Sequence, residues 1–158
     1  MPTIELVSIN QSSPVLFEDL PFAVEVDNQL KSHRYPSLFQ TDFDLFSGYI
    51  YHLGGFTENN NDGGIFTAYE LLSNDSSNQA ESRFVEFKKE IFPFIQIIIK
   101  TLLDSSPSGE VIFTSDYQFS ENNIQKFESM ALDTFCELHN KKELLFNASY
   151  KIINQVTA

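Results

Sequence analysis

The chain has 158 residues, a length that suits one domain with its own core, and no second domain is expected. Its 42% of hydrophobic residues, among them 16 Phe, exclude a disordered chain. Its formal net charge of −12 opposes binding to phosphate backbones and anionic lipid, so neither a nucleic acid nor a membrane is expected as a partner.

The first half of the chain is predicted to form mainly strands. Apolar and polar residues alternate over residues 3–9 and 21–27, the pattern of a strand with one buried face. Residues 31–47 give a mixed pattern, which predicts a short helix or an irregular segment. Two runs rich in aromatic and β-branched residues follow, at 49–53 and 65–72, and the Gly- and Asn-rich stretch between them predicts a hairpin.

The second half is predicted to form two helices and two strands. Apolar residues recur every three or four positions over residues 84–102, which predicts a helix, and Pro93 inside that pattern should kink or split it. Residues 110–115 are mostly apolar, as expected of a central strand. A second helix is expected over residues 120–140, with a serine as its N-cap, and residues 144–153 predict a last strand.

This order of elements predicts an α+β fold. We expect a single α+β domain over residues 1–158, in which a mixed β-sheet of about six strands packs on one layer of two main helices. The last strand–helix–strand unit, residues 110–153, would pair its two strands in parallel around a right-handed crossover.

Several features favour a soluble protein of the cytoplasm. No secretory signal is visible at residues 1–10. The most apolar stretch, residues 91–103, is interrupted by polar residues and is shorter than the roughly 20 residues of a membrane span. The single cysteine, Cys136, suits a reducing compartment. No nucleotide-binding, metalloprotease or hydrolase motif is present, so no cofactor is expected.

The loop before residue 65 resembles a calcium-binding loop in its spacing. Glu58, Asn60 and Asp62 occupy the first, third and fifth positions of such a loop, and a glycine follows at the sixth. The twelfth position, which should supply a bidentate Glu, is Tyr69. The favoured interpretation is therefore a flexible polar hairpin loop, and weak metal binding through the three oxygen-bearing residues is the alternative.

A second candidate site combines two of the three histidines with acidic and basic neighbours: His33, Arg34, Tyr35, Asp42, Asp44 and His52. These types could bind a divalent metal or share a proton in acid–base chemistry, although their spacing matches no known signature. The simpler interpretations are that His52 is bonded to the backbone or to a nearby Asp, and that Arg34 forms a salt bridge. The functional interpretation makes residues 33–35 part of a recognition surface.

Cys136 and His139 lie three residues apart on the second predicted helix, so their side chains should be neighbours on its surface. A thiolate activated by a histidine has this outline. One helical turn leaves little room for a substrate between them, so we expect an unreactive, half-buried cysteine.

The uneven distribution of charge decides the expected function. Residues 1–82 hold 12 acidic and 2 basic side chains, a net of −10, whereas residues 83–158 hold 10 and 8, a net of −2. An acidic surface steers a basic partner inward. We therefore expect a non-catalytic binding protein, of the inhibitor, immunity or adaptor kind, for a basic protein. The alternative is a small-molecule- or metal-binding protein or an enzyme that uses the His33, Asp42, Asp44 and His52 cluster.

Overall fold

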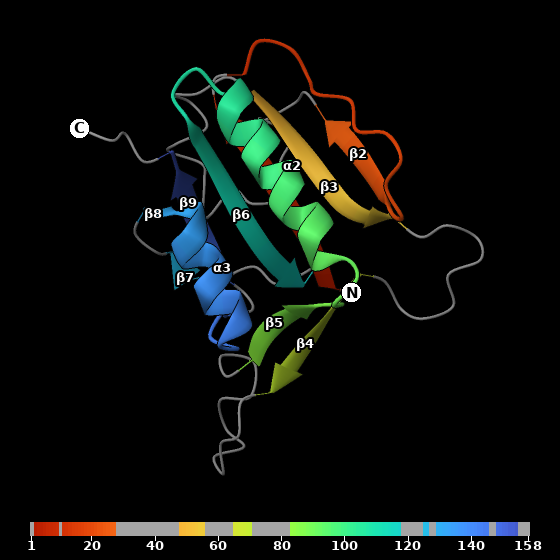
Figure 1. The fold of residues 1–158 in the computed structure, drawn as a ribbon, viewed down its shortest axis with the longest axis vertical. Coiled ribbons are helices and arrows are strands. Elements are labelled where there is room, and N and C mark those ends of the chain that lie inside the picture. Colours follow the sequence, from red (N-terminus) through yellow and green to blue (C-terminus); the bar gives the residue numbers. More distant parts are fainter. Residues whose placement is uncertain are drawn as a thin grey trace.

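The computed structural model describes residues 2–9, 11–27, 48–55, 65–70, 83–117, 125–126, 129–145 and 148–154. Within them the chain forms a large mixed sheet with a long helix across one face, a second, shorter helix, and a separate two-stranded sheet (Figure 1). The predicted α+β class is therefore confirmed.

The large sheet has the strand order β2-β3-β1-β6-β9-β7, and β8 also pairs with β9. Its strands are β1 (Pro2–Ile9), β2 (Ala23–Asp27), β3 (Gly48–Gly55), β6 (Glu110–Tyr117), β7 (Gln125–Lys126), β8 (Met130–Ala131) and β9 (Ala148–Ile153). β6 lies between β1 and β9, which confirms the predicted central strand. The short strands β7 and β8 run parallel to β9 and the other pairs are antiparallel, so the sheet is mixed.

The long helix, α2 (Phe92–Ser105), has Pro93 as its second residue, at the position where the sequence pattern predicted a kink. Pro93 lies in the first turn, where backbone N–H groups have no partner within the helix and a missing N–H costs nothing. The kink prediction is wrong for this reason. The buried face of the helix, with Ile95, Ile98 and Ile99 fully enclosed, packs on the sheet and forms the core with it.

The small sheet corrects two predictions. β4 (Phe66–Glu70) pairs antiparallel with β5 (Arg83–Phe87), whereas β3 pairs with β1 and β2, so the hairpin predicted between β3 and β4 is wrong. Residues 83–87 form a strand where a helix was predicted. Val85 and Phe87 are buried, whereas Phe84, which lies between Arg83 and Val85, is half-buried. The buried side chains thus recur with a period of two, which the helical spacing of the phenylalanines concealed.

The second helix, α3 (Leu132–Asn140), is shorter than predicted at its start but ends where expected. Ala131 is extended, with φ −72° and ψ 159°, because it belongs to β8 and pairs with β9. The residues just before α3 are therefore part of the sheet and not of the helix. β6 and β9 are antiparallel neighbours, so the predicted parallel pairing of these two strands is wrong.

Both faces of the large sheet are enclosed at its centre. Ile4 and Leu6 of β1 belong to the core under α2, as the alternating pattern predicted. Glu5 and Val7 point to the opposite face, yet they are only 2% and 4% exposed. A single buried face for β1 is thus an incomplete prediction. Neither helix in the described part of the chain is long and apolar enough to cross a membrane.

Candidate functional site

Most of the predicted site residues fall outside the part of the chain that the structure describes. His33, Arg34, Tyr35, Asp42 and Asp44 are among them, and so are the candidate metal ligands Glu58, Asn60 and Asp62. Their roles stay predictions. The remaining member, His52, lies on β3 and can be placed.

His52 is held by a buried carboxylate on the neighbouring strand. Its Nδ1 lies 2.9 Å from Oε2 of Glu5, and the two residues face each other in the register of β3 and β1. The side chain of His52 is 26% exposed, whereas that of Glu5 is 2% exposed. His52 thus has a carboxylate partner, as the simpler interpretation held, but the partner is Glu5 and not one of the predicted Asp residues.

The pair belongs to a polar row across the face of the sheet opposite α2. In register, Glu25 of β2 faces His52, and Glu5 faces Thr114 of β6, which faces Ser149 of β9. The hydroxyls of Thr114 and Ser149 lie 3.2 Å apart. Among the described residues, no group of three or more His, Cys, Asp or Glu side chains is placed to hold a metal ion.

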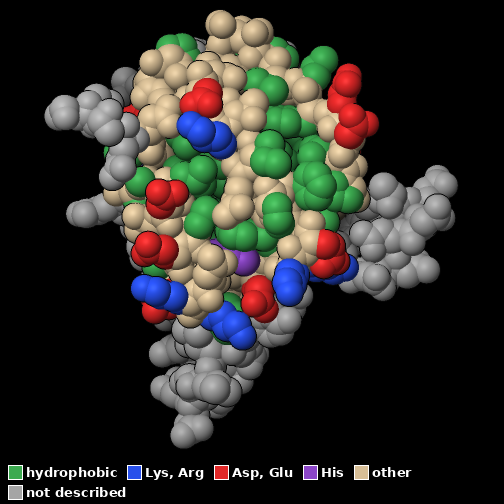
Figure 2. All heavy atoms as spheres, in the orientation of Figure 1, with side chains coloured by type: hydrophobic (Ala, Val, Ile, Leu, Met, Phe, Trp, Pro, Cys, Tyr) green, Lys and Arg blue, Asp and Glu red, His purple; other side chains and the backbone are tan. Residues whose placement is uncertain are grey.

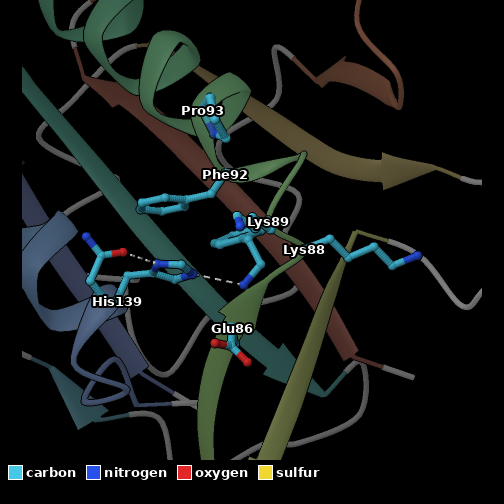
Figure 3. Close-up of a pocket in the computed structure, with 8 residues that line it drawn as sticks. Glu86, Lys88, Lys89, Phe92, Pro93 and His139 are labelled. Atoms are coloured by element: carbon cyan, nitrogen blue, oxygen red, sulfur yellow. Dashed lines mark hydrogen bonds between the residues drawn. The ribbon is translucent and has the colours of Figure 1, made fainter.

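An open pocket of about 460 Å³ lies where the end of β5, the start of α2 and the end of α3 meet (Figure 3). It is lined by Glu86, Phe87, Lys88, Lys89, Phe92, Pro93, His139 and Asn140. The N–H groups of Ile91 and Phe92 donate to the carbonyl of Lys88, and that of Phe94 donates to the carbonyl of Ile91, so these three N–H groups are not free to bind an anion. Figure 3 shows Lys88 extending away from His139.

The hydrogen bonds and the ring contact of His139 in this pocket are those of a residue with a structural role. Nε2 accepts a hydrogen bond from the backbone N–H of Phe87 at 3.0 Å, so the ring proton is on Nδ1, which donates to Oδ1 of Asn140 at 3.1 Å. The ring stacks on Phe92, with centroids 3.6 Å apart. Burial lowers the pKa of His139, and the bond to Asn140 and the carboxylate of Glu86 oppose this only in part. With both ring nitrogens occupied, His139 is not poised as a base.

The sequence offered a signal for this role. His139 follows Phe135 by four residues, and both are buried, so the histidine continues the apolar stripe of α3. Cys136 is half-buried, accepts a hydrogen bond from Gln96 at 3.2 Å, and has its thiol pKa raised mainly by burial. The two side chains have separate partners, and Cys136 is half-buried as expected, while its lack of reactivity stays a prediction.

A third region combines exposed carboxylates with exposed apolar side chains, and we name it the amino-terminal face: Leu16, Glu18, Asp19, Glu25 and Val26. Leu16 is 79% exposed and Val26 is 37% exposed, both high values for large apolar residues. The three carboxylates are exposed as well.

Tyr51 joins the two segments that form the amino-terminal face. Its hydroxyl accepts a hydrogen bond from the N–H of Val15 at 2.9 Å and donates to Gln11, and its ring meets Phe17 edge-on at 6.0 Å. Val26 faces Tyr51 in the β2–β3 register. Tyr51 thus contacts the residues on either side of Leu16 and faces Val26 in the sheet. In Figure 2 hydrophobic side chains gather between α2 and β2, acidic side chains lie at the upper right edge, and acidic and basic side chains are mixed along the lower edge.

Comparison of this chain with protein-family models, with curated protein sequences and with solved structures finds no match.

Proposed function

We propose that this protein is a non-catalytic binding protein for a partner with a basic surface, of the inhibitor, immunity or adaptor kind. The observation that carries the proposal is the amino-terminal face, whose two segments expose three carboxylates and two large apolar side chains. Residues 2–27 and 48–70, which supply this face and its supporting strands, contain no Lys or Arg.

The lysines of the second half do not offset these carboxylates where the structure describes their ion pairs. Lys100 pairs with Asp104 on α2, at 3.3 Å, and Lys151 pairs with Glu110 across β9 and β6, at 3.0 Å. Each of these lysines thus balances a carboxylate of its own half. Among the described residues, Glu18, Asp19 and Glu25 belong to none of the ion pairs that the structure shows.

The two kinds of side chain on this face would have separate tasks. Exposed charges mainly raise the association rate and select the partner, and they act less at high salt. Affinity comes from apolar groups that lose water in the complex. Burying one leucine side chain stabilises a complex by about 1.5–3 kcal/mol, so Leu16 is the natural anchor.

Capture of partners from cells of the same organism tests the proposal, with wild-type protein immobilised at low salt and eluted with rising salt. We expect a basic protein that elutes early. The variant Glu18→Lys/Glu25→Lys should lose it, whereas Glu137→Lys/Glu143→Lys, which changes two exposed carboxylates elsewhere, should retain it. A captured protein that is not basic, or equal loss with both variants, would overturn the proposal.

The competing function, a small-molecule- or metal-binding protein or an enzyme, is supported by the Glu5–His52 pair. A carboxylate that fixes an imidazole through Nδ1 is the arrangement by which a histidine is oriented as a base or a metal ligand. Titration of the protein with Zn²⁺, followed through the NMR signals of the His52 ring, tests this function. Saturable binding that His52→Gln abolishes would favour it, and unchanged signals would count against metal binding at His52.

A further inference from the structure

β2 is an edge strand of the large sheet. It pairs with β3 from Val24–Leu53 to Asp27–Ile50, and no other described strand pairs with it. At the other end of the sheet, β9 is flanked by both β7 and β8. A strand bonded on one side presents a row of backbone N–H and C=O groups on the other, where an extended chain can be added.

The side chains of β2 make this edge selective. Glu25 is exposed and Val26 partly exposed, so a charged and an apolar group are offered on opposite faces of one strand. If a second copy of the chain paired there with matching residues opposed, Glu25 would face a like charge, which destabilises a strand pair.

We propose that the outer edge of β2 accepts an extended, basic segment of the partner as an additional strand. This inference rests on the proposed function and specifies how the partner binds. The segment carries a cationic residue beside Glu25 and an apolar residue on the opposite face, beside Val26. Main-chain hydrogen bonds hold the segment, and the two faces select its sequence.

The occupant follows from charge complementarity. The only Asp, Glu, Lys or Arg residues of the segment 11–27 are Glu18, Asp19, Glu25 and Asp27, and β3 contains none of these four residue types. An acidic segment would meet repulsion along the whole edge, and a purely apolar segment would leave these carboxylates without a partner in the interface.

Peptide binding measured by fluorescence anisotropy tests the inference. The probe alternates valine and lysine, and its matched control has the same sequence with every second backbone amide N-methylated, which blocks strand pairing but keeps the charge. We expect the control to bind at least about tenfold more weakly, the equivalent of one or two lost hydrogen bonds. Amide signals of β2 should shift on addition of the unmodified probe.

Variants separate this inference from the proposed function. Glu25→Lys should weaken binding of the valine–lysine probe and allow a valine–glutamate probe to bind. Glu143→Lys should change the binding of neither peptide. If the valine–lysine probe and its N-methylated control bind equally, the inference of strand addition is wrong, while the proposal of a basic partner stands. If neither binds, or if the protein self-associates through β2 in sedimentation, the inference also fails, and partner capture then judges the proposed function alone.

Discussion

His139, near the end of α3, accepts a hydrogen bond from the last residue of β5: the backbone N–H of Phe87 donates to its Nε2 at 3.0 Å. A second bond lies nearby, from the N–H of Val85 to the carbonyl of Leu144 at 2.7 Å. Together they attach the two-stranded sheet to the chain around α3. Because the histidine must be neutral to accept the first bond, the attachment depends on pH.

We expect the free energy of unfolding to fall as the pH drops below neutral. The pKa of His139 is lowered in the folded protein, chiefly by burial, while the unfolded chain keeps the ordinary value of about 6.5. Below that pH the unfolded state therefore binds more protons than the folded state. The stability from this residue is complete above about pH 6.5 and is lost as the pH falls toward the folded pKa. Urea unfolding between pH 8 and pH 5 measures it.

The variant His139→Gln isolates this contribution. Its amide oxygen can still accept from the N–H of Phe87, but the stacking on Phe92 is lost, so we expect unfolding to be easier by about 1–3 kcal/mol at neutral pH. Because glutamine does not titrate, the stability should change less between pH 7 and pH 5 than in the wild type. An unchanged slope would assign the pH dependence to other groups.

Tyr51 is predicted to stabilise the amino-terminal face through its hydroxyl. Tyr51→Phe keeps the ring contacts but leaves the half-buried N–H of Val15 without its acceptor. We expect a loss of about 1–2 kcal/mol in the free energy of unfolding and faster hydrogen exchange at Val15. Tyr49→Phe is the matched control, because the hydroxyl of Tyr49 makes a longer, exposed bond of 3.4 Å to Ser12. Equal effects of the two variants would contradict the prediction.

Glu5 and His52 are predicted to be energetically coupled. His52→Gln removes a charge-assisted partner from a carboxylate that is 2% exposed, and we expect a cost of about 1–3 kcal/mol. In a double-mutant cycle with Glu5→Gln, the two losses should sum to more than the loss in the double variant. Independent, additive losses would mean that the 2.9 Å contact contributes nothing to stability.

Sequence reasoning succeeded where local pattern and tertiary context agree. β1, β2 and β6 were predicted because their residues alternate or form short apolar runs, and the end of α3 was predicted because the polar stretch at Asn140 stops its apolar stripe. In residues 83–87 the two levels disagree. Phe84 and Phe87 are spaced like a helical face, but pairing with β4 places them in a strand. Which of the two patterns wins is decided by this non-local pairing, which local propensity does not encode.

The described part of the candidate site shows the same limit. Glu5 was assigned to a predicted strand, but that it partners His52 follows only from the order of β1 and β3 in the sheet. Residues 5 and 52 are far apart along the chain, and their facing positions depend on register. By contrast, the acidity of the first half is a property of composition, so it could be determined without knowledge of the fold.

Pro93 gives the sharpest test of where α2 begins. If it lay inside the helix, its replacement by alanine would stabilise the protein by about 3 kcal/mol, since interior proline breaks the hydrogen-bond ladder and clashes with the preceding turn. In the first turn it removes only an N–H that has no partner there, and it also restricts the unfolded chain. We therefore expect Pro93→Ala to destabilise slightly, by up to about 1 kcal/mol, in chemical denaturation. Marked stabilisation would place the start of the helix before Phe92.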